Sequence, residues 1–235
     1  MKSFLSFMSF TSFGLPSVGV VGMRRSRAAI SDMMAFEAEA MSNGFRRIAG
    51  VDEAGRGPLA GPIVAGAVVL AEPIEGLNDS KQLTARRREA LYAQLHGGRH
   101  AIGVGIVEAA EIDRHGIQTA NYSAMAQAVA ALDSPPDFLL VDGFMIRGCA
   151  VPQKAVIKGD SRSFSIAAAS IVAKVTRDRI MDSLDAQYPD YGFARHKGYA
   201  TREHLDALRR LGPCPAHRMS FAPICRPPAP GDLFE

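Results

Sequence analysis

Two adjacent carboxylates stand directly before a glycine-rich turn early in this chain, in the segment DEAGRGPL at residues 52–59. Carboxylate oxygens are the ligands that hard divalent cations such as Mg²⁺ and Mn²⁺ prefer. A turn with exposed N–H groups and a guanidinium, here that of Arg56, is suited to binding phosphate. Metal ligands beside a phosphate-binding turn are what the hydrolysis or transfer of a phosphodiester requires.

Two further acids occur where chain geometry favours a site. Asp142 ends a predicted strand, and Asp160 lies in the Lys-Gly-Asp turn before a long predicted helix. Because ligands collect at the carboxyl ends of neighbouring strands in open α/β sheets, we expect these acids near Asp52 and Glu53. Taken singly, Asp142 is also a common turn residue and Asp160 a common helix cap. A buried cluster of four acids, however, is costly without a cation.

Asp52 and Glu53 are consecutive, and consecutive side chains on a strand face opposite ways. They can therefore share a metal only if the strand breaks between them or just after them, and Gly55 and Gly57 permit such a break. Four acids without a matching set of Cys and His favour Mg²⁺ or Mn²⁺ over zinc. Two such ions about 4 Å apart can stabilise the attacking water and the leaving oxygen of an in-line displacement.

A mixture of strands and helices must position these acids. Apolar β-branched runs between turn residues predict strands, and segments with helical apolar periodicity predict helices. The expected strands are 46–51, 63–70, 101–107, 138–141 and 151–157. The expected helices are 85–95 (begun by Thr84), 117–132, 163–184 and 201–211. This order indicates an α/β fold.

Other chemistries fit these residues less well. The segment GRGPLA at 55–60 matches the loose dinucleotide pattern G-x-G-x-x-A, but a strand follows it, so no helix N-terminus is offered to a pyrophosphate. The chain has no G-x-x-x-x-G-K-[ST] segment, which excludes a P-loop. Cys214, His217 and Cys225 lack the fourth ligand and the usual spacing of a zinc site.

The 235 residues carry a net charge of +3 and are 47% hydrophobic, which is ordinary for a soluble globular domain. Residues 46–142 hold nine Lys and Arg against twelve Asp and Glu, whereas residues 143–235 hold fourteen against nine. An acidic part followed by a basic part fits metal ligands and a polyanion track, although ordinary surface charge gives the same count. Three scattered cysteines indicate a reducing compartment, and no apolar run approaches the length of a membrane span.

We expect the folded domain to cover residues 45–225 and a flexible tail to cover residues 226–235. Residues 1–22 imitate a signal peptide only faintly, because they lack a clear basic start and a convincing cleavage site. We interpret residues 1–44 as a disordered extension or as the result of a start codon placed too early. The true start would then be Met33, Met34 or Met41.

Seven short blocks together resemble the bacterial ribonuclease HII family, the type 2 ribonucleases H. Each block is weak alone, but they follow one another in the family's order over about residues 45–225. The blocks are GVDEAGRGPLAGP at 50–62, NDSKQL at 78–83, VDG at 141–143, KGD at 158–160, AASIVAKVTRDR at 168–179, HKGYAT at 196–201 and HRMSF at 217–221.

The resemblance implies a ribonuclease H-like α/β fold, with a mixed central sheet flanked by helices and a small helical C-terminal part. It implies endonucleolytic cleavage of the RNA strand of RNA–DNA hybrids, and cleavage 5′ of a single ribonucleotide in duplex DNA, with 5′-phosphate and 3′-hydroxyl products. Mn²⁺ or Mg²⁺ would be the cofactor. The third type of ribonuclease H, with its large N-terminal substrate-binding domain, fits poorly because only about 45 residues precede the motifs.

The matching motifs imply roles for individual residues. The resemblance makes four residues the metal-binding catalytic acids: Asp52, Glu53, Asp142 and Asp160. Gly55, Arg56 and Gly57 would form the turn that senses the 2′-hydroxyl at the RNA–DNA junction, and Tyr199 would pack on the sugar of the next nucleotide. Both roles are physically reasonable, because the 2′-hydroxyl alone distinguishes RNA from DNA locally and a flat ring can reject a ribose by its shape.

Several polar residues are candidates for contacts with substrate phosphates: Lys81, Lys158, Ser170 and Lys174. Ser170, Lys174 and Arg177 share one helical stripe, for which a solvated face is an equally good interpretation. Asp178 is interpreted as a structural ion-pair partner of its neighbours Arg177 and Arg179 rather than as a fifth catalytic acid.

Around Tyr199, the segment 195–197 is a further candidate for phosphate contacts, and the pair His217-Arg218 is expected to brace the site or the substrate backbone.

Two other functions remain open at this point. One is a nuclease of the ribonuclease H fold that acts on DNA alone, such as a resolvase or transposase core. The other is a hybrid-binding module without catalysis, which the four acids disfavour because acids repel phosphate. The predicted partners are RNA–DNA hybrids and DNA duplexes that contain ribonucleotides, and no membrane. We expect a cytoplasmic monomer, and a sliding-clamp partner is left open.

Overall fold

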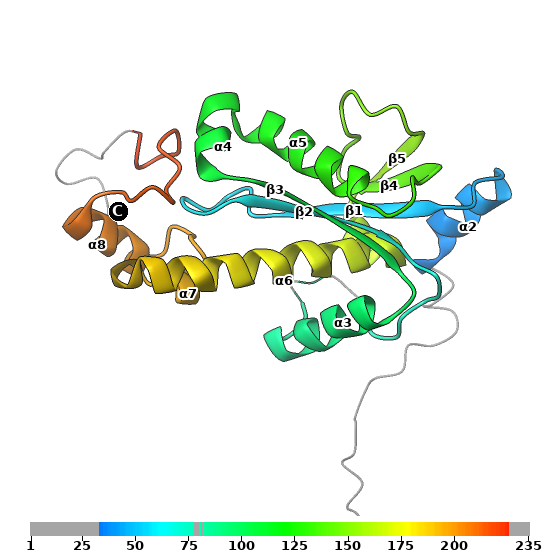
Figure 1. Cartoon of the computed structure of the whole chain (residues 1–235), viewed down its shortest axis with the longest axis horizontal. Coiled ribbons are helices and arrows are strands. Elements are labelled where there is room, and N and C mark those ends of the chain that lie inside the picture. Colours follow the sequence, from blue (N-terminus) through cyan, green and yellow to red (C-terminus); the bar gives the residue numbers. More distant parts are fainter. Residues whose placement is uncertain (1–32, 78–79, 81, 226–235) are drawn as a thin grey trace, which may run out of the picture.

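A computed structural model describes residues 33–77, 80 and 82–225 of the chain. Its centre is a mixed five-stranded sheet in the order β3-β2-β1-β4-β5 (Figure 1). The strands are β1 (Ile48–Ala54), β2 (Ile63–Val69), β3 (Ala101–Val107), β4 (Phe138–Asp142) and β5 (Gln153–Val156). β2 pairs antiparallel with both β1 and β3, whereas β4 pairs parallel with both β1 and β5.

Helices cover both faces of the sheet (Figure 1). One face carries α4 and α5, and the other carries α3 and the long α6. A small C-terminal part is built from α7, which lies beside the C-terminal part of α6, and α8, which lies near the end of that helix. The helices are α2 (Ala35–Ser42), α3 (Ala85–Gly97), α4 (Ala109–His115), α5 (Ile117–Ala130), α6 (Phe164–Gln187), α7 (Phe193–His196) and α8 (Arg202–Leu211), with short 3-10 turns at Gly159–Ser161 and Pro189–Tyr191.

The two central strands are buried on both sides, which explains their continuous apolar sequences. Glycine lets α6 approach the sheet closely. A Cβ on Gly50 would lie 2.0 Å from the backbone carbon of Ser165, and one on Gly66 would lie 2.5 Å from the carbonyl oxygen of Ala169. This contact places the N-terminal half of α6 directly beneath β1, the strand that carries Asp52 and Glu53.

The predicted α/β architecture is confirmed, including all five strands and the four predicted helices. One boundary differs in a way that affects the site, and one short helix was not expected. β1 continues to Ala54, three residues beyond its predicted end, because Asp52, Glu53 and Ala54 still pair with β2. The short helix α4, between β3 and α5, was not predicted. No helix in the described part of the chain is both long and apolar enough to cross a membrane.

Helix α2 lies in the segment for which the sequence predicted no fold. Its Glu37 is 3% exposed, and its Oε1 accepts hydrogen bonds from the Ser163 hydroxyl at 2.7 Å and from the Ser165 N–H at 3.0 Å. Ala40 of α2 packs beside Ile48 at the start of β1. α2 therefore caps the N-terminus of α6 and belongs to the packed domain. Residues 1–32 of the predicted extension and the predicted tail lie outside the described residues.

Replacing Glu37 with alanine is expected to lower the free energy of unfolding by about 1–3 kcal/mol, because two donors at the start of α6 lose their acceptor. The matched control is Glu39→Ala on the same helix, whose carboxylate is half exposed and pairs with Lys154. That change should cost less than about 1 kcal/mol. Urea unfolding of both variants measures the difference. Equal losses would show that the Glu37 cap adds nothing.

Candidate active site

Asp52 and Asp142 lie side by side on the face of the sheet that α6 covers. In the parallel pair β1–β4, Val51 is in register with Val141, and both valines point into the core beneath α5. The next residue on each strand must therefore face α6. Asp52 is only 4% exposed. The sheet register thus brings together two acids that are 90 residues apart in the chain.

Burial raises the pKa of Asp52 well above its ordinary value, and the nearby charges of Glu53 and Asp142 raise it further. A hydrogen bond from Ser170 acts in the opposite direction, because it favours the ionised carboxylate. Ser170 is 4% exposed, and its hydroxyl also bonds to that of Ser80 at 2.8 Å. Ser170 is therefore a buried hydrogen-bond partner of Asp52. A residue that contacts a bound strand would be more exposed.

Asp142 is fixed to the turn that carries Asp160. The Gly159 N–H donates to Asp142 Oδ1 at 2.6 Å, and Asp160 follows at 6% exposure. Glycine fits closely here, since a Cβ at position 159 would lie 2.5 Å from Ile166 Cδ1 and 3.3 Å from Asp142 Oδ1. This contact joins the end of β4 to the turn before α6 and so brings the segment of Asp160 to Asp142.

Glu53 follows Asp52 at the end of β1, and its charge is the largest of the neighbouring charges that raise the pKa of Asp52, so the two carboxylates lie close together. β1 does not break between them, because Glu53 still pairs with β2, and the strand ends after Ala54, where Gly55 adopts a φ of +98°. Glu53 Oε1 lies 3.5 Å from Arg56 Nη1, and the Arg56 guanidinium bonds to Gln118 of α5 at 2.9 Å. The predicted break is therefore present just after the pair of acids, one residue beyond Glu53.

The donor set fits a hard divalent cation. All the predicted ligands are carboxylates, and a buried Asp52 with a raised pKa carries charge that a bound cation would neutralise. Within residues 33–77, 80 and 82–225, no three His, Cys, Asp or Glu side chains are arranged as a metal-binding group.

The turn after β1 is held by a buried guanidinium. Arg218 is 0% exposed and donates to three carbonyl oxygens of the turn, at 2.6 Å to Gly55, 3.1 Å to Arg56 and 2.9–3.0 Å to Gly61. Burial, and then the charge of Arg177, lower the pKa of Arg218 to about 9, so it stays charged at neutral pH. The predicted bracing role of Arg218 is therefore confirmed for the protein's own backbone.

Arg177 holds the same turn from the side of α6. It is 0% exposed and donates to the carbonyl oxygens of Pro62 at 3.0 Å, Ala60 at 3.1 Å and Lys197 at 3.1 Å. The interpretation of Arg177 as part of a phosphate-contacting stripe is wrong, because α6 turns it toward the protein interior. The carbonyl oxygens of the turn thus point at guanidinium groups. Within the described chain, the N–H groups of Arg56 and Gly57 donate to no other residue.

Tyr199 borders this turn. Its side chain is half exposed, and a Cβ built on Gly57 would lie 4.0 Å from Tyr199 Cε1. The Leu59 N–H donates to the Gly198 carbonyl at 2.8 Å, which ties the two segments together. The structure therefore brings Tyr199 and the Gly55–Gly57 turn together, although 142 residues separate Gly57 from Tyr199.

The predicted basic contacts have different surroundings. Lys158 is exposed on the turn beside Asp160, whereas Lys174 is largely buried and pairs with Asp178 at 2.6 Å. Asp178 therefore forms a structural ion pair, as predicted, but its partner is Lys174 and not a flanking arginine, because Arg177 points inward and Arg179 pairs with an acid of α3. Lys81 lies outside the described residues.

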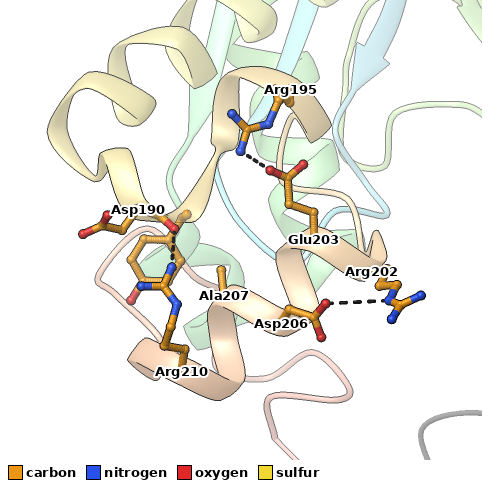
Figure 2. Close-up of a pocket in the computed structure, with 8 residues that line it drawn as sticks. Asp190, Arg195, Arg202, Glu203, Asp206, Ala207 and Arg210 are labelled. Atoms are coloured by element: carbon orange, nitrogen blue, oxygen red, sulfur yellow. Dashed lines mark hydrogen bonds and ion pairs between the residues drawn. The ribbon is translucent and has the colours of Figure 1, made fainter.

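The segment 195–197 is already engaged within the protein. Arg195 pairs with Glu203, Lys197 pairs with Asp182, and His196 is buried. Figure 2 shows the first of these pairs at the rim of a hollow of about 700 Å³ on α8. Three arginines and three acids line this hollow, so its charges balance and it offers no distinct site for a polyanion: Asp190, Arg195, Arg202, Glu203, Asp206 and Arg210.

Three histidines pack behind Tyr199, and the sequence motifs did not indicate this cluster. His196 stacks on His204 with ring centroids 4.4 Å apart, and the Nε2 atoms of His204 and His217 are 3.0 Å apart. Burial lowers the pKa of both His204 and His217 to about 4, and the neighbouring histidines add to this. In place of a metal contact, His217 Nδ1 accepts a hydrogen bond from the backbone N–H of Cys214.

These two depressed pKa values predict how stability depends on pH. Between pH 6.5 and about 4 the unfolded chain takes up a proton at His204 and at His217, whereas the folded chain does not. Stability should therefore be full above pH 6.5 and fall with pH by about 1.4 kcal/mol per unit for each histidine. The raised pKa of Asp52 has the opposite effect, because the folded state binds that proton more tightly than the unfolded chain does, which favours folding as the pH falls. Urea unfolding at pH 7, 6 and 5 of the wild type and His217→Gln isolates one histidine, and identical pH slopes would contradict the prediction.

Comparison with known proteins shows the family of this chain. The family model described as Ribonuclease HII matches residues 49–224. The chain is 57% identical over 195 residues to Ribonuclease HII of Geobacillus kaustophilus, covering 82% of this chain and 75% of that one. It is 53% identical over 197 residues to Ribonuclease HII of Geobacter metallireducens, covering 83% and 92%.

Solved structures confirm the fold. The crystal structure of ribonuclease H2 from Pyrococcus horikoshii superposes with a TM-score of 0.65 at 30% identity, covering 77% of this chain and 96% of that one. The RNase HII of the PCNA complex from Archaeoglobus fulgidus gives a TM-score of 0.65 at 26% identity, covering 75% and 95%. The predicted ribonuclease H-like fold is confirmed, and the chain belongs to the ribonuclease HII family, which makes it a ribonuclease H, an endoribonuclease that acts on RNA–DNA hybrids.

Proposed function

We propose that this enzyme cuts 5′ of single ribonucleotides in duplex DNA, as well as within RNA–DNA hybrids, and leaves 5′-phosphate and 3′-hydroxyl ends. The observation that carries the proposal is the position of the Gly55–Gly57 turn. It follows directly after the strand of Asp52, and it lies beside the half-exposed ring of Tyr199. A site of this kind can contact the reacting phosphate and the sugars on both sides of it.

The catalytic acids in this proposal are Asp52, Glu53, Asp142 and Asp160, as ligands of two Mn²⁺ or Mg²⁺ ions. Such ions, when bound, supply charge stabilisation for the attacking and leaving oxygens. The protein itself orients the ligands. The Gly159 N–H holds one oxygen of Asp142, and Ser170 and the Glu53 N–H bond to Asp52.

The turn supports recognition of the ribose. Because Arg177 and Arg218 bind its carbonyl oxygens, the N–H groups of Arg56 and Gly57 are left to donate to a ligand such as a 2′-hydroxyl or a phosphate oxygen. The ring of Tyr199 would lie against the sugar of the following nucleotide and favour a deoxyribose there by shape.

Phosphate contacts beyond the scissile bond are proposed for Lys81, Lys158 and Lys174. Lys158 has the support of an exposed side chain beside Asp160. Lys174 is held by Asp178, so the pair can present an ordered ammonium rather than a free one. Ser170 is proposed to orient Asp52 and not to touch the strand.

The test is a labelled DNA duplex with one ribonucleotide, incubated with Mn²⁺, with Mg²⁺ and with EDTA. The expected result is a single metal-dependent cut on the 5′ side of the ribonucleotide. The control is the same duplex without the ribonucleotide, which should stay intact. Cleavage of the all-DNA duplex would instead support the resolvase-like alternative, and hybrid binding without any cut would support the binding module.

The proposed role is the removal of ribonucleotides in DNA replication and repair, by a monomer in the cytoplasm. The Archaeoglobus fulgidus relative was solved as a complex with PCNA, which supports a sliding clamp as a candidate partner. Size-exclusion chromatography with the clamp of the source organism tests this. A shared elution peak is expected, and separate elution at micromolar concentrations would contradict it.

A further inference from the structure

The contact between His204 and His217 stands out among the buried polar groups because it lies behind the recognition elements and not among the acids. Both side chains are buried, at 0% and 2% exposure, and their Nε2 atoms are 3.0 Å apart. Two imidazole nitrogens form a hydrogen bond only if one carries a proton and the other does not. Their other contacts decide which one does.

His204 Nδ1 lies 2.9 Å from the carbonyl oxygen of Tyr199, which can only accept, so this nitrogen carries the proton of the neutral ring. His204 Nε2 is then an acceptor. The Cys214 N–H, which can only donate, lies 2.9 Å from His217 Nδ1. His217 therefore carries its proton on Nε2 and donates it to His204. The longer contact of His217 Nδ1 with the Cys214 carbonyl, at 3.2 Å, would need the other tautomer, which breaks both shorter bonds.

Each histidine is anchored to one of the two recognition segments. His204 on α8 holds the backbone of Tyr199. His217 forms a β-bridge with Ala60 of the turn, and the next residue, Arg218, binds the turn through its guanidinium and donates its N–H to the Leu59 carbonyl. The hydrogen bond between the histidines thus connects the segment of Tyr199 with the segment that carries the Gly55–Gly57 turn.

The third histidine fixes the orientation of the pair. His196 stacks on His204 and bonds through Nε2 to the Tyr191 carbonyl at 2.8 Å, while its Nδ1 accepts from the Gly198 N–H at 3.2 Å. Phe193 packs its edge against both His196 and His204. A ring that is packed on its face and bonded at both nitrogens has one orientation, which is what a positioning element needs.

We propose that the His204–His217 hydrogen bond is a positioning element that sets the Tyr199 ring against the Gly55–Gly57 turn and thereby determines how strongly the enzyme prefers a ribonucleotide followed by a deoxyribonucleotide. This inference rests on the proposed function. Neither histidine touches the substrate. The hydrogen bond acts through the backbone of Tyr199 on one side and through the backbone of the turn on the other.

The test compares His217→Phe, which keeps a ring but loses the donor, with His217→Gln, whose amide N–H can still reach His204. The measured quantity is the ratio of kcat/KM on the single-ribonucleotide duplex to kcat/KM on a uniform RNA–DNA hybrid. His217→Phe should lower this ratio on the order of tenfold, because a displaced ring costs most where the following sugar is read. His217→Gln should restore it to within about threefold of the wild type.

A double-mutant cycle with Tyr199→Ala separates positioning from general damage. If the histidine acts through the tyrosine, His217→Phe should change the ratio little in the Tyr199→Ala background. Should His217→Phe fold poorly, His204→Asn provides a second route, because it keeps a donor for the Tyr199 carbonyl while it removes the bond to His217 together with the ring that stacks on His196.

An unchanged ratio in a folded variant, or effects that simply add in the cycle, would overturn the inference. A wild type with no preference for the junction substrate would instead overturn the proposed function, so the two failures are distinguishable.

Discussion

Asp52→Asn should abolish cleavage and at the same time make the metal-free protein more stable. The loss of activity is expected to be on the order of 10³-fold or more, because an amide replaces a carboxylate where divalent cations must bind. The gain in stability has a separate cause. Burial and the charges of Glu53 and Asp142 raise the pKa of Asp52, so the folded state binds its proton more tightly than the unfolded chain does. At pH 7, above the unfolded pKa, this charge opposes folding.

Asparagine relieves that charge and keeps an oxygen that can accept the bonds of Ser170 and of the Glu53 N–H. The free energy of unfolding in EDTA should therefore rise by about 1–2 kcal/mol. Added Mn²⁺ should stabilise the wild type by mass action but leave the variant unchanged. Thermal unfolding with Mn²⁺ and with EDTA, together with the duplex cleavage assay, measures all three effects.

Asp137→Asn is the matched control. Asp137 also accepts two backbone N–H bonds, from Arg46 and Arg47 at 2.8 Å each, but it lies at the other end of β4 from Asp142. This variant should keep full activity and lose a little stability, the opposite of Asp52→Asn. Full activity in Asp52→Asn, or a loss of stability in EDTA, would contradict the assignment of Asp52 as a metal ligand held in a site of excess negative charge.

Arg218→Met should destabilise the protein by about 3–5 kcal/mol and remove cleavage at single ribonucleotides. The guanidinium supplies all the donors described for the carbonyl oxygens of Gly55 and Arg56, and two of its nitrogens bond to Gly61. Without it, three carbonyl groups in the interior lose a charged donor, each at a cost of about 1 kcal/mol or more. The turn would then no longer present its N–H groups in one geometry.

Arg210→Met on α8 serves as the control, because Arg210 is exposed and its one hydrogen bond within the described residues goes to the Asp190 carbonyl, at 3.3 Å. Its effect should stay within about 0.5 kcal/mol. Urea unfolding gives the stability of both variants, and the single-ribonucleotide duplex gives their activity. A stable Arg218→Met variant with normal junction cleavage would show that the turn keeps its shape without the guanidinium. Arg218→Lys should lose less stability than Arg218→Met and more than Arg210→Met, because an ammonium cannot reach all three carbonyls in one plane.

Much of the secondary structure followed from local pattern. The run of apolar residues at 63–70 matches β2, and the predicted strand at 101–107 matches β3 residue for residue. Thr84 caps its helix as predicted, by accepting the Arg87 N–H at 3.3 Å. These elements were predictable because their signals, periodicity and a capping side chain, lie within a few residues of one another.

Several predictions that differ from the structure depend on contacts between distant segments. β1 continues to Ala54 because β2 pairs with it, and α2 is stabilised by donors of α6 that lie 126 and 128 residues further along the chain. Arg177 has the same spacing as Ser170 and Lys174, so no helical periodicity could indicate that it points inward. Its carbonyl partners belong to the turn after β1 and to the segment before Tyr199.

The sequence by itself determined the α/β class, the strands and helices, the family and the chemical character of the site, since residue types, spacing and motif order are local properties. Only the tertiary structure decided which of these residues face one another. Sheet register puts Asp52 beside Asp142, while packing buries Arg177, Arg218 and the histidine pair behind the recognition turn. The physical reason is that a side chain's direction on a strand or helix is set locally, but its partner is chosen by the packing of elements far apart in the chain.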